Sequence, residues 1–449
     1  MLPLPDSRTA LARRMTVIAL PVIANNLFTI GMQLTDTVMA GRLSAHALAA
    51  VSVGGSVFVP FFLLALGILA ALSPASAQLY GAGRPERVGP LARQAAWLAL
   101  VLAGVLMAGF RFLAPLYRLS GIDGGLAAVS ESYVGAMAWG LPAIFLYLVL
   151  RFASEGFGHT RPMLYVALAA FLVNIPLDYW FIYGGLGVPR MGAVGCGYAS
   201  ALAMWVQFAM MLAYVLLSRR RYRPFALFAR FDLPRLAPLV ELARLGLPIG
   251  VMLFAEVSLF GAVALLMASF GAVTAAAHQI AVAISSFSFM FPMGLATGIS
   301  VVVGQAAGAG KYALARRAGL VGVGLSLLFE IVAAILILAL RVPLARLFTS
   351  NGAVIALAAE LLLLAAAFQL SDGLQVASAG ALRGLKDVRV PMFITVLAYW
   401  GTGLPLAWAF GFKLGVGPAG VWIGLIAGLT VAGLLLFLRF VRRRVIMGT

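Results

Sequence analysis

Long apolar runs, separated by short polar segments, follow one another along almost the whole chain. A helix that crosses the hydrocarbon core of a bilayer needs about 20 predominantly apolar residues. Runs that meet this requirement lie near residues 11–40, 47–72, 91–113, 127–150, 162–183, 192–217, 238–270, 275–302, 315–341, 352–382, 390–412 and 418–441. The pattern therefore predicts an all-α polytopic membrane protein with twelve transmembrane helices. The first run is too long for a signal-peptide core of roughly 7 to 15 residues, so we expect it to remain as a span.

The composition is typical of an integral membrane protein. Of the 449 residues, 63% are hydrophobic and only 10% are charged, whereas about a quarter of the residues in a soluble domain are charged. The net charge of +18 is explained by retention of Lys and Arg on the cytoplasmic side, so we expect no nucleic acid as partner. Cys196 is the single cysteine, which excludes an intramolecular disulfide.

The basic residues also predict the orientation. With the N terminus inside, most of the 32 Lys and Arg residues fall on the cytoplasmic side of the predicted spans. The exceptions, which would face out, are Arg42, Arg111, Arg118, Arg190, Arg341, Arg346 and Lys413. An error in the number of spans would have distributed the basic residues over both sides, so this asymmetry supports the prediction of twelve spans. We therefore expect a multi-pass protein of the bacterial inner membrane with both termini in the cytoplasm.

The two halves of the chain repeat one another. Residues 78–84, Gln-x-x-Gly-Ala-Gly-Arg, recur 227 positions later as 305–311, Gln-x-x-Gly-Ala-Gly-Lys, and Pro176-Leu177 recurs as Pro405-Leu406 at an offset of 229. Six spans per half give both halves the same orientation, which is a parallel repeat. The predicted organisation is an N-lobe over 1–217, a basic cytoplasmic linker over 218–237 and a C-lobe over 238–449. Two such lobes can work by alternating access.

Five acids lie inside the predicted spans: Asp36, Asp178, Glu256, Glu330 and Asp372. A carboxylate in hydrocarbon costs several kcal/mol, so such residues usually face an internal cavity and mark an ion or proton path. At 1.5 Å per residue, Glu256 and Asp372 would lie roughly 16 to 18 Å above the cytoplasmic arginines, and Asp36 and Asp178 roughly 25 to 33 Å above them. The acids thus form one predicted pair in each half.

Two carboxylates at one depth repel, which favours binding of a proton or a small cation between them. Asn174, one turn before Asp178, and Ser200 on the next span could add neutral oxygen ligands. We therefore predict cation coupling by Asp36, Asn174, Asp178, Ser200, Glu256 and Asp372. Each acid could instead pair with a hydroxyl or backbone group and hold helices together. Glu330 has no counterpart in the repeat, and for this residue the sequence favours neither the coupling role nor the structural role.

The eighth span carries Phe287, Phe289, Met290 and Met293, which could bind flat cationic drugs through dispersion and cation–π contacts. Packing or lipid contact is the commoner role for such side chains. A phosphate-binding Gly-rich loop ending in Lys-Ser/Thr is absent from the sequence. The chain also lacks a nucleophile constellation and metal-ligand spacing. We therefore expect neither an enzyme nor an ATP-driven pump, and no cofactor.

Several motifs together resemble the multidrug and toxic compound extrusion (MATE) family, in particular its NorM-type branch. They are Pro21-x-x-x-Asn25, residues 36–41 (Asp-Thr-Val-Met-Ala-Gly), the two Gln-x-x-Gly-Ala-Gly loops, residues 277–279 (Ala-His-Gln), residues 372–375 (Asp-Gly-Leu-Gln) and residues 382–387 (Leu-Arg-Gly-Leu-Lys-Asp). The resemblance covers nearly the whole chain. It implies a V-shaped pair of six-helix bundles that exports cationic drugs in exchange for Na⁺ or H⁺.

Carried over by position, the resemblance makes Asp36 the coupling acid of the N-lobe, and Glu256 and Asp372 the cation-binding acids of the C-lobe. Some Na⁺-coupled relatives have a tyrosine where this chain has Phe368, which lacks the hydroxyl oxygen of tyrosine. We expect small organic cations and membrane lipid as partners, and a monomer.

Other classes of membrane protein remain as alternatives. A lipid-linked oligosaccharide flippase of the same superfamily would need a basic cavity, whereas the mid-membrane charges here are acidic. A major-facilitator carrier would have an acidic residue between glycines and then Arg-Arg in the loop where this chain has residues 81–86, Gly-Ala-Gly-Arg-Pro-Glu. A structural protein without transport activity is the remaining possibility.

Overall fold

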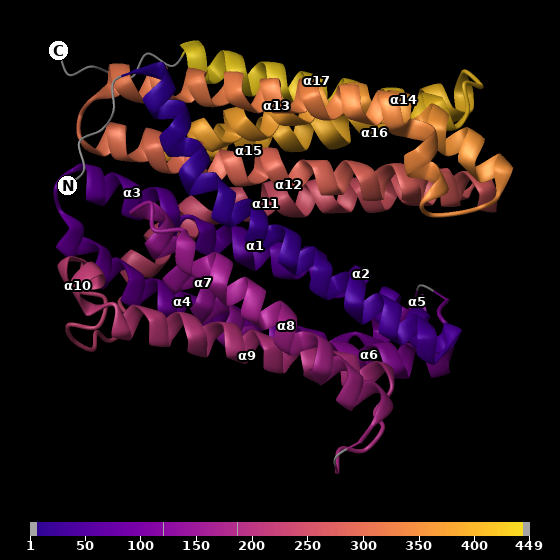
Figure 1. Cartoon of the computed structure of the whole chain (residues 1–449), viewed down its shortest axis with the longest axis horizontal. Coiled ribbons are helices and arrows are strands. Elements are labelled where there is room, and N and C mark those ends of the chain that lie inside the picture. Colours follow the sequence, from indigo (N-terminus) through magenta and orange to yellow (C-terminus); the bar gives the residue numbers. More distant parts are fainter. Residues whose placement is uncertain (1–6, 120, 186, 443–449) are drawn as a thin grey trace. The chain divides into compact units, whose positions relative to one another are not determined.

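The structure is a computed structural model that describes residues 7–119, 121–185 and 187–442 (Figure 1). Its long helices are α1 (Arg8–Leu43), α2 (Ala45–Ala70), α4 (Val88–Gly109), α6 (Gly124–Ala138), α7 (Leu141–Gly156), α8 (Arg161–Tyr183), α9 (Ala193–Leu217), α11 (Leu236–Ala268), α12 (Ala272–Gly308), α13 (Tyr312–Arg346), α14 (Gly352–Gly384) and α17 (Pro418–Arg442). Shorter segments are α3 (Leu72–Gly81), η1 (Pro85–Arg87), η2 (Phe110–Phe112), α5 (Ala114–Leu119), α10 (Arg219–Tyr222), η3 (Arg223–Phe225), α15 (Arg389–Val396), η4 (Leu397–Gly403), α16 (Leu404–Trp408) and η5 (Ala409–Lys413).

The predicted spans are present. Among the described residues, 11 helical segments are long and apolar enough to cross a membrane, and the bent pair α6–α7 completes a set of up to 12. This confirms the all-α polytopic fold class. The second span continues to Gly81 instead of ending near residue 72, because α3 follows α2 after Ala71. Its polar residues Ser73 and Ser76 are buried, so packing against protein sustains a helix that hydropathy alone would end.

The fourth span is broken at its middle. Helices α6 and α7 meet at an angle of 45° around Trp139 and Gly140. Pro142 in the first turn of α7 has no N–H to donate to the preceding turn of α6, which explains why one straight helix does not form. A Cβ on Gly140 would lie 2.4 Å from Met204 Sδ, so only glycine lets the break pack against α9.

The described residues group into two compact units. We call residues 24–80 and 84–250 the N-terminal unit; residues up to Ile23, 81–83 and those from Val251 onward form the C-terminal unit. The division falls inside α1 after Ile23 and inside α11 after Gly250. These positions are 227 residues apart, so the first helix of each half is divided at equivalent points of the repeat. The lobe and linker boundaries at 217 and 238 remain a prediction.

In the N-terminal unit, the segment between α9 and α11 is held against α4. Arg93 donates hydrogen bonds to Asp232 Oδ2 (2.7 Å) and to the Ala226 carbonyl oxygen (2.6 Å). Trp97 Nε1 donates to the Asp232 carbonyl oxygen at 2.9 Å. The Arg93 guanidinium holds the pKa of Asp232, in the polar connection outside the spans, below its usual value. Much of the predicted linker therefore has a fixed path.

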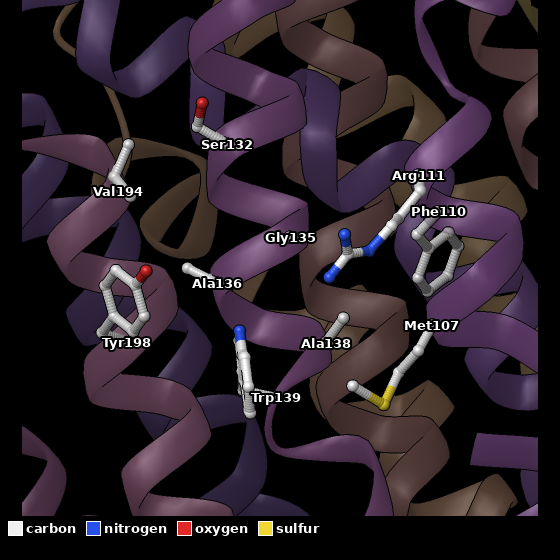
Figure 2. Close-up of a pocket in the computed structure, with 10 residues that line it drawn as sticks. All are labelled: Met107, Phe110, Arg111, Ser132, Gly135, Ala136, Ala138, Trp139, Val194 and Tyr198. Atoms are coloured by element: carbon white, nitrogen blue, oxygen red, sulfur yellow. The ribbon is translucent and has the colours of Figure 1, made fainter. Parts of the chain in front are cut away.

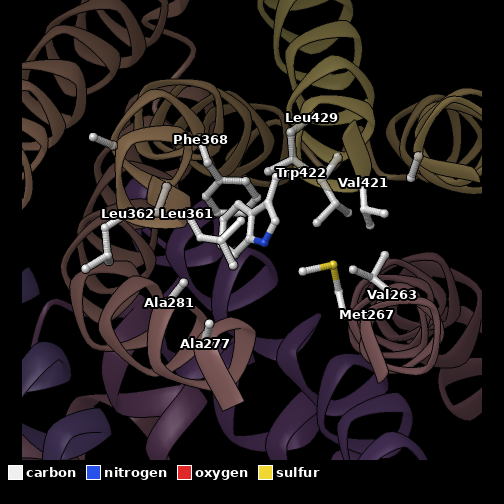
Figure 3. Close-up of a cluster of buried hydrophobic side chains, with 14 of the residues drawn as sticks. Val263, Met267, Ala277, Ala281, Leu361, Leu362, Phe368, Val421, Trp422 and Leu429 are labelled. Carbon is white, nitrogen blue, oxygen red and sulfur yellow. The ribbon is translucent and has the colours of Figure 1, made fainter. Parts of the chain in front are cut away.

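The C-terminal unit has a continuous apolar core (Figure 3). Trp422 on α17 lies at its centre and is 1% exposed, with its ring 6.0 Å from Phe368 on α14. Met267 and Val263 approach from α11 (Figure 3). Glycine lets the neighbouring helices come close: a Cβ on Gly424 would lie 2.1 Å from the Ala407 backbone nitrogen. This packing fixes the helices that carry Glu256 and Asp372.

Candidate cation sites

The N-terminal unit brings four predicted site residues together. Asp36 extends from α1, Asn174 and Asp178 from α8, and Ser200 from α9, and all are buried. Asn174 and Asp178 are four residues apart, so both side chains lie on one face of α8. The three helices therefore place two acids, an amide and a hydroxyl in one cluster, as the sequence predicted.

Hydrogen bonds define the arrangement of this cluster. Asn174 Nδ2 donates to Asp36 Oδ1 at 2.9 Å and also to Asp178 Oδ2. Ser200 Oγ donates to Asp36 Oδ2 at 2.9 Å. Both oxygens of Asp36 thus have donors. Asp178 Oδ1 and Asn174 Oδ1 are buried without a partner among the described residues, and they are the oxygens still able to bind a proton or cation.

Cys196 belongs to the same cluster, and we did not predict it. A carboxylate oxygen of Asp36, one of Asp178 and the Cys196 sulfur all lie within 4.8 Å of one another. Two buried carboxylates this close repel strongly unless a positive charge, a proton or a cation, lies between them. Cys196 is four residues before Ser200, which places both on one face of α9. This four-residue spacing is the sequence feature from which the position of Cys196 could have been predicted.

The C-terminal unit holds the second group of acids. Asp372 on α14 is 2% exposed and lies within electrostatic range of Glu256 on α11 and Glu330 on α13. Tyr399 in η4 is within range of Glu256 and Asp372, and its buried hydroxyl has no partner among the described residues. The predicted pair Glu256 and Asp372 is therefore a group with a third acid and a phenol. Tyr399 was not predicted, because a tyrosine within an apolar span does not stand out from the sequence as a carboxylate does.

Glu330 is completely buried. A Cβ on Gly373 would lie 2.4 Å from Glu330 Cγ, so the Glu330 side chain occupies the space that this glycine leaves open beside Asp372. Neither carboxylate oxygen of Glu330 has a hydrogen-bond partner in the described part of the chain. The alternative interpretation, that Glu330 only holds helices together, requires hydrogen bonds that the described residues do not provide.

The aromatic and methionine residues predicted to bind substrate all lie on α12. Phe287 is 58% exposed and its ring is 6.3 Å from that of Phe291. At about 100° per residue, Phe287 and Phe289 lie about 160° apart around the helix axis, whereas Met290 is about 60° from both Phe287 and Met293. Phe289, Met290 and Met293 are partly buried. Phe287 and Phe289 therefore project to opposite sides of the helix, and one substrate molecule could not contact both rings together.

Comparison with known proteins decides the family. A family model described as MatE matches the chain in two segments, residues 21–180 and 248–409. The chain belongs to the MATE family. The starts of the two segments are 227 residues apart and their ends are 229 apart, the same offsets as in the sequence repeat. Both acids of each predicted pair lie inside a matched segment.

Individual relatives agree with this assignment. The MATE chain is 42% identical over 435 residues to the multidrug resistance protein PmpM of Pseudomonas aeruginosa, covering 96% of this chain and 91% of PmpM. Its fold is similar to that of the eukaryotic MATE transporter AtDTX14, with a TM-score of 0.87 at 20% identity over 97% of this chain and 96% of the other. A mutant of the Vibrio cholerae MATE transporter VcmN gives a TM-score of 0.87 at 20% identity, covering 97% of each chain.

Proposed function

We propose that this MATE transporter exports small organic cations, including cationic drugs, in exchange for Na⁺ or H⁺. The observation that carries the proposal is the group of carboxylates in each unit, all buried except the partly buried Glu256, inside helices long enough to span a membrane. Such groups in spans typically mark ion pathways. The 42% identity to a multidrug resistance protein supports export of drugs as the purpose of that pathway.

In the N-terminal unit, Asp36 and Asp178 would share one proton or one cation. Asn174 and Ser200 hold Asp36 in place, and Asp178 Oδ1 and Asn174 Oδ1 provide free oxygens for the ion. An ion bound here neutralises the repulsion between the carboxylates, and its release restores that repulsion. The ion thereby stabilises one arrangement of the helices over another, which is what coupling requires.

In the C-terminal unit, Glu256 and Asp372 would bind the substrate cation or a coupling ion. Asp372 lies within electrostatic range of Glu256 and Glu330. The three acids together attract positive charge more strongly than one carboxylate would. Phe289, Met290 and Met293 could cover the apolar part of a substrate. The acidic character of these groups disfavours a flippase for pyrophosphate-linked sugars.

The orientation is also part of the proposal. Basic residues gather in the connections that we place in the cytoplasm, which supports a bacterial inner-membrane protein with cytoplasmic termini. Two lobes, divided by the linker over 218–237, would alternate access within a monomer. This arrangement needs neither a cofactor nor ATP.

Drug efflux from bacterial cells that lack their own pumps tests the proposal. Expression should lower the accumulation of ethidium and norfloxacin, and Glu256→Gln or Asp372→Asn should restore it. Matched controls come from the same helices: Glu241→Gln on α11 and Glu360→Gln on α14 replace exposed acids and should retain efflux. Unchanged drug accumulation on expression of a correctly inserted wild-type protein would count against export, and full efflux by either core variant would remove that residue from the mechanism.

A further inference from the structure

A cavity of about 460 Å³ lies among α4, η2, α6 and α9 of the N-terminal unit (Figure 2). It is separate from the Asp36 cluster and plays no part in the proposed coupling. Its walls combine one cation, aromatic side chains and small residues. The lining residues are Met107, Phe110, Arg111, Ser132, Gly135, Ala136, Ala138, Trp139, Val194 and Tyr198.

The break in the fourth span explains this cavity. Helix α4 packs closely along α7 but touches α6 at only a few points, because α6 turns away from the line of α7 by 45°. Gly135, Ala136 and Ala138 have no side chains large enough to fill the space between α4 and α6. A Cβ on Gly135 would meet no atom within 4 Å. The cavity is thus a consequence of the bend.

Arg111 supplies the charge. It follows α4 in η2, and Figure 2 shows its guanidinium group directed toward the part of α6 that carries Gly135. No acceptor in the described part of the chain hydrogen-bonds it or forms an ion pair with it. A guanidinium at the end of a membrane span is stabilised by a bound anion, and its fork of N–H donors matches a phosphate group.

Two further donors line the same cavity. Figure 2 shows the indole nitrogen of Trp139 directed along the cavity toward Ala136, and the hydroxyl of Tyr198 on the α9 side. The Trp139 backbone is itself fixed, because its carbonyl oxygen accepts a hydrogen bond from Trp205 Nε1 at 3.1 Å. Trp and Tyr are the residues that typically contact the headgroup region of a bilayer. The cavity therefore offers a cation and neutral donors to an acidic group.

The surroundings of the cavity favour a lipid over a soluble anion. Phe112, next to Arg111, is 77% exposed, and Val105 on α4 is 61% exposed. In a span these side chains face acyl chains. A ligand whose phosphate reached Arg111 would therefore have its apolar tail beside Phe112 and Val105, which a phospholipid satisfies and free phosphate does not.

We propose that this cavity is a binding site for an acidic phospholipid, whose headgroup phosphate pairs with Arg111 between η2 and the broken fourth span. The lipid comes from the leaflet in which η2 lies. It fills the space that the bend opens and ties α4 to α6, and it is distinct from any exported drug.

Native mass spectrometry of the purified full-length protein tests the site with phosphatidylglycerol and phosphatidylcholine of identical acyl chains. Both lipids carry the phosphate, but the choline cation of phosphatidylcholine is repelled by Arg111 and offsets the phosphate charge, so we expect phosphatidylglycerol to bind about 10-fold more tightly. Arg111→Gln should remove this preference. Gly135→Leu should reduce phosphatidylglycerol binding by filling the cavity, and should still fold because its Cβ meets no other atom.

Matched controls separate the site from general effects of charge and bulk. Arg118→Gln removes another exposed arginine near η2, and Gly104→Leu adds the same bulk at an exposed position of α4 that does not line the cavity. Both should retain the preference. Equal binding of the two lipids, an unchanged preference in Arg111→Gln, or displacement of the lipid by equimolar glycerol 3-phosphate would each overturn the proposal.

Discussion

Asn174 Nδ2 donates a hydrogen bond to Asp36 Oδ1 at 2.9 Å and so joins α8 to α1 inside the N-terminal unit. The same nitrogen donates to Asp178, which makes Asn174 the bridge between two buried carboxylates. An amide is suited to this position because it donates through its nitrogen and keeps an oxygen for a cation. Asn174 therefore links the structural and the ion-binding roles of the cluster.

Replacing Asn174 by Ala should weaken both roles. Asp36 and Asp178 would both lose the amide donor of Asn174, while Asp36 would keep the Ser200 donor. A buried polar group without a partner costs about 1–3 kcal/mol, so we expect a melting temperature several degrees lower and strongly reduced drug efflux. Thr37→Ala is the control, because Thr37 is exposed and bonds only to its own helix. Equal melting temperatures for Asn174→Ala and wild type would show that the bridge contributes little.

The contact of Glu330 with Gly373 can be tested by a double-mutant cycle. Gly373→Ala should destabilise the protein by about 1–3 kcal/mol, because the new methyl group overlaps Glu330 Cγ. In a Glu330→Ala background the same change should be nearly neutral, since the overlapping atom is gone. Unfolding free energies in detergent give the coupling. Additive effects of the two changes would contradict the placement of Glu330 against Gly373.

The stability of the connection between α7 and α8 should depend on pH through His159. Burial, together with the charge of Arg221, lowers the pKa of His159 from 6.5 to about 4. Between these values the unfolded chain binds a proton that the folded chain does not, so the melting temperature should fall as pH decreases from about 6.5 to about 4. His159→Gln should flatten this part of the profile. A variant profile as steep as that of wild type would assign the dependence to other groups.

The connection after α9 should lose its protection from proteases when Arg93 is replaced. Arg93→Ala removes the ion pair with Asp232 and the bonds to two backbone carbonyl groups. Trypsin should then cleave between residues 219 and 235 at least several-fold faster than in wild type. Arg87→Ala, a change near the start of the same helix at an exposed residue, is the control. Equal cleavage rates would show that Arg93 does not hold this segment.

Hydropathy and basic residues were sufficient to predict the spans, because the bilayer imposes a fixed length and a charge asymmetry. They could not predict the break at Gly140, which depends on Pro142 and on close packing with Met204. Nor could they predict that α2 continues into α3, since Ser73 and Ser76 interrupt the apolar run and their burial depends on packing against other helices.

The candidate sites show a similar limit. Spacing along one helix predicted the partnership of Asn174 with Asp178, and the comparison of depths predicted that Glu256 and Asp372 are neighbours. Neither argument applied to Cys196 or Tyr399. The proximity of Cys196 to Asp36, and the position of Tyr399 within electrostatic range of Asp372, depend on how helices rotate against one another. The periodicity of a single sequence does not encode that rotation.

Cation-driven export is tested most directly by substrate efflux from proteoliposomes under an imposed Na⁺ gradient and, separately, an imposed pH gradient. We predict that at least one gradient drives ethidium transport by wild type. Asp36→Asn, which leaves the cluster with a single buried carboxylate, should reduce that transport to the level of empty liposomes. Transport by wild type that neither gradient drives, or undiminished gradient-driven transport by Asp36→Asn, would contradict this account.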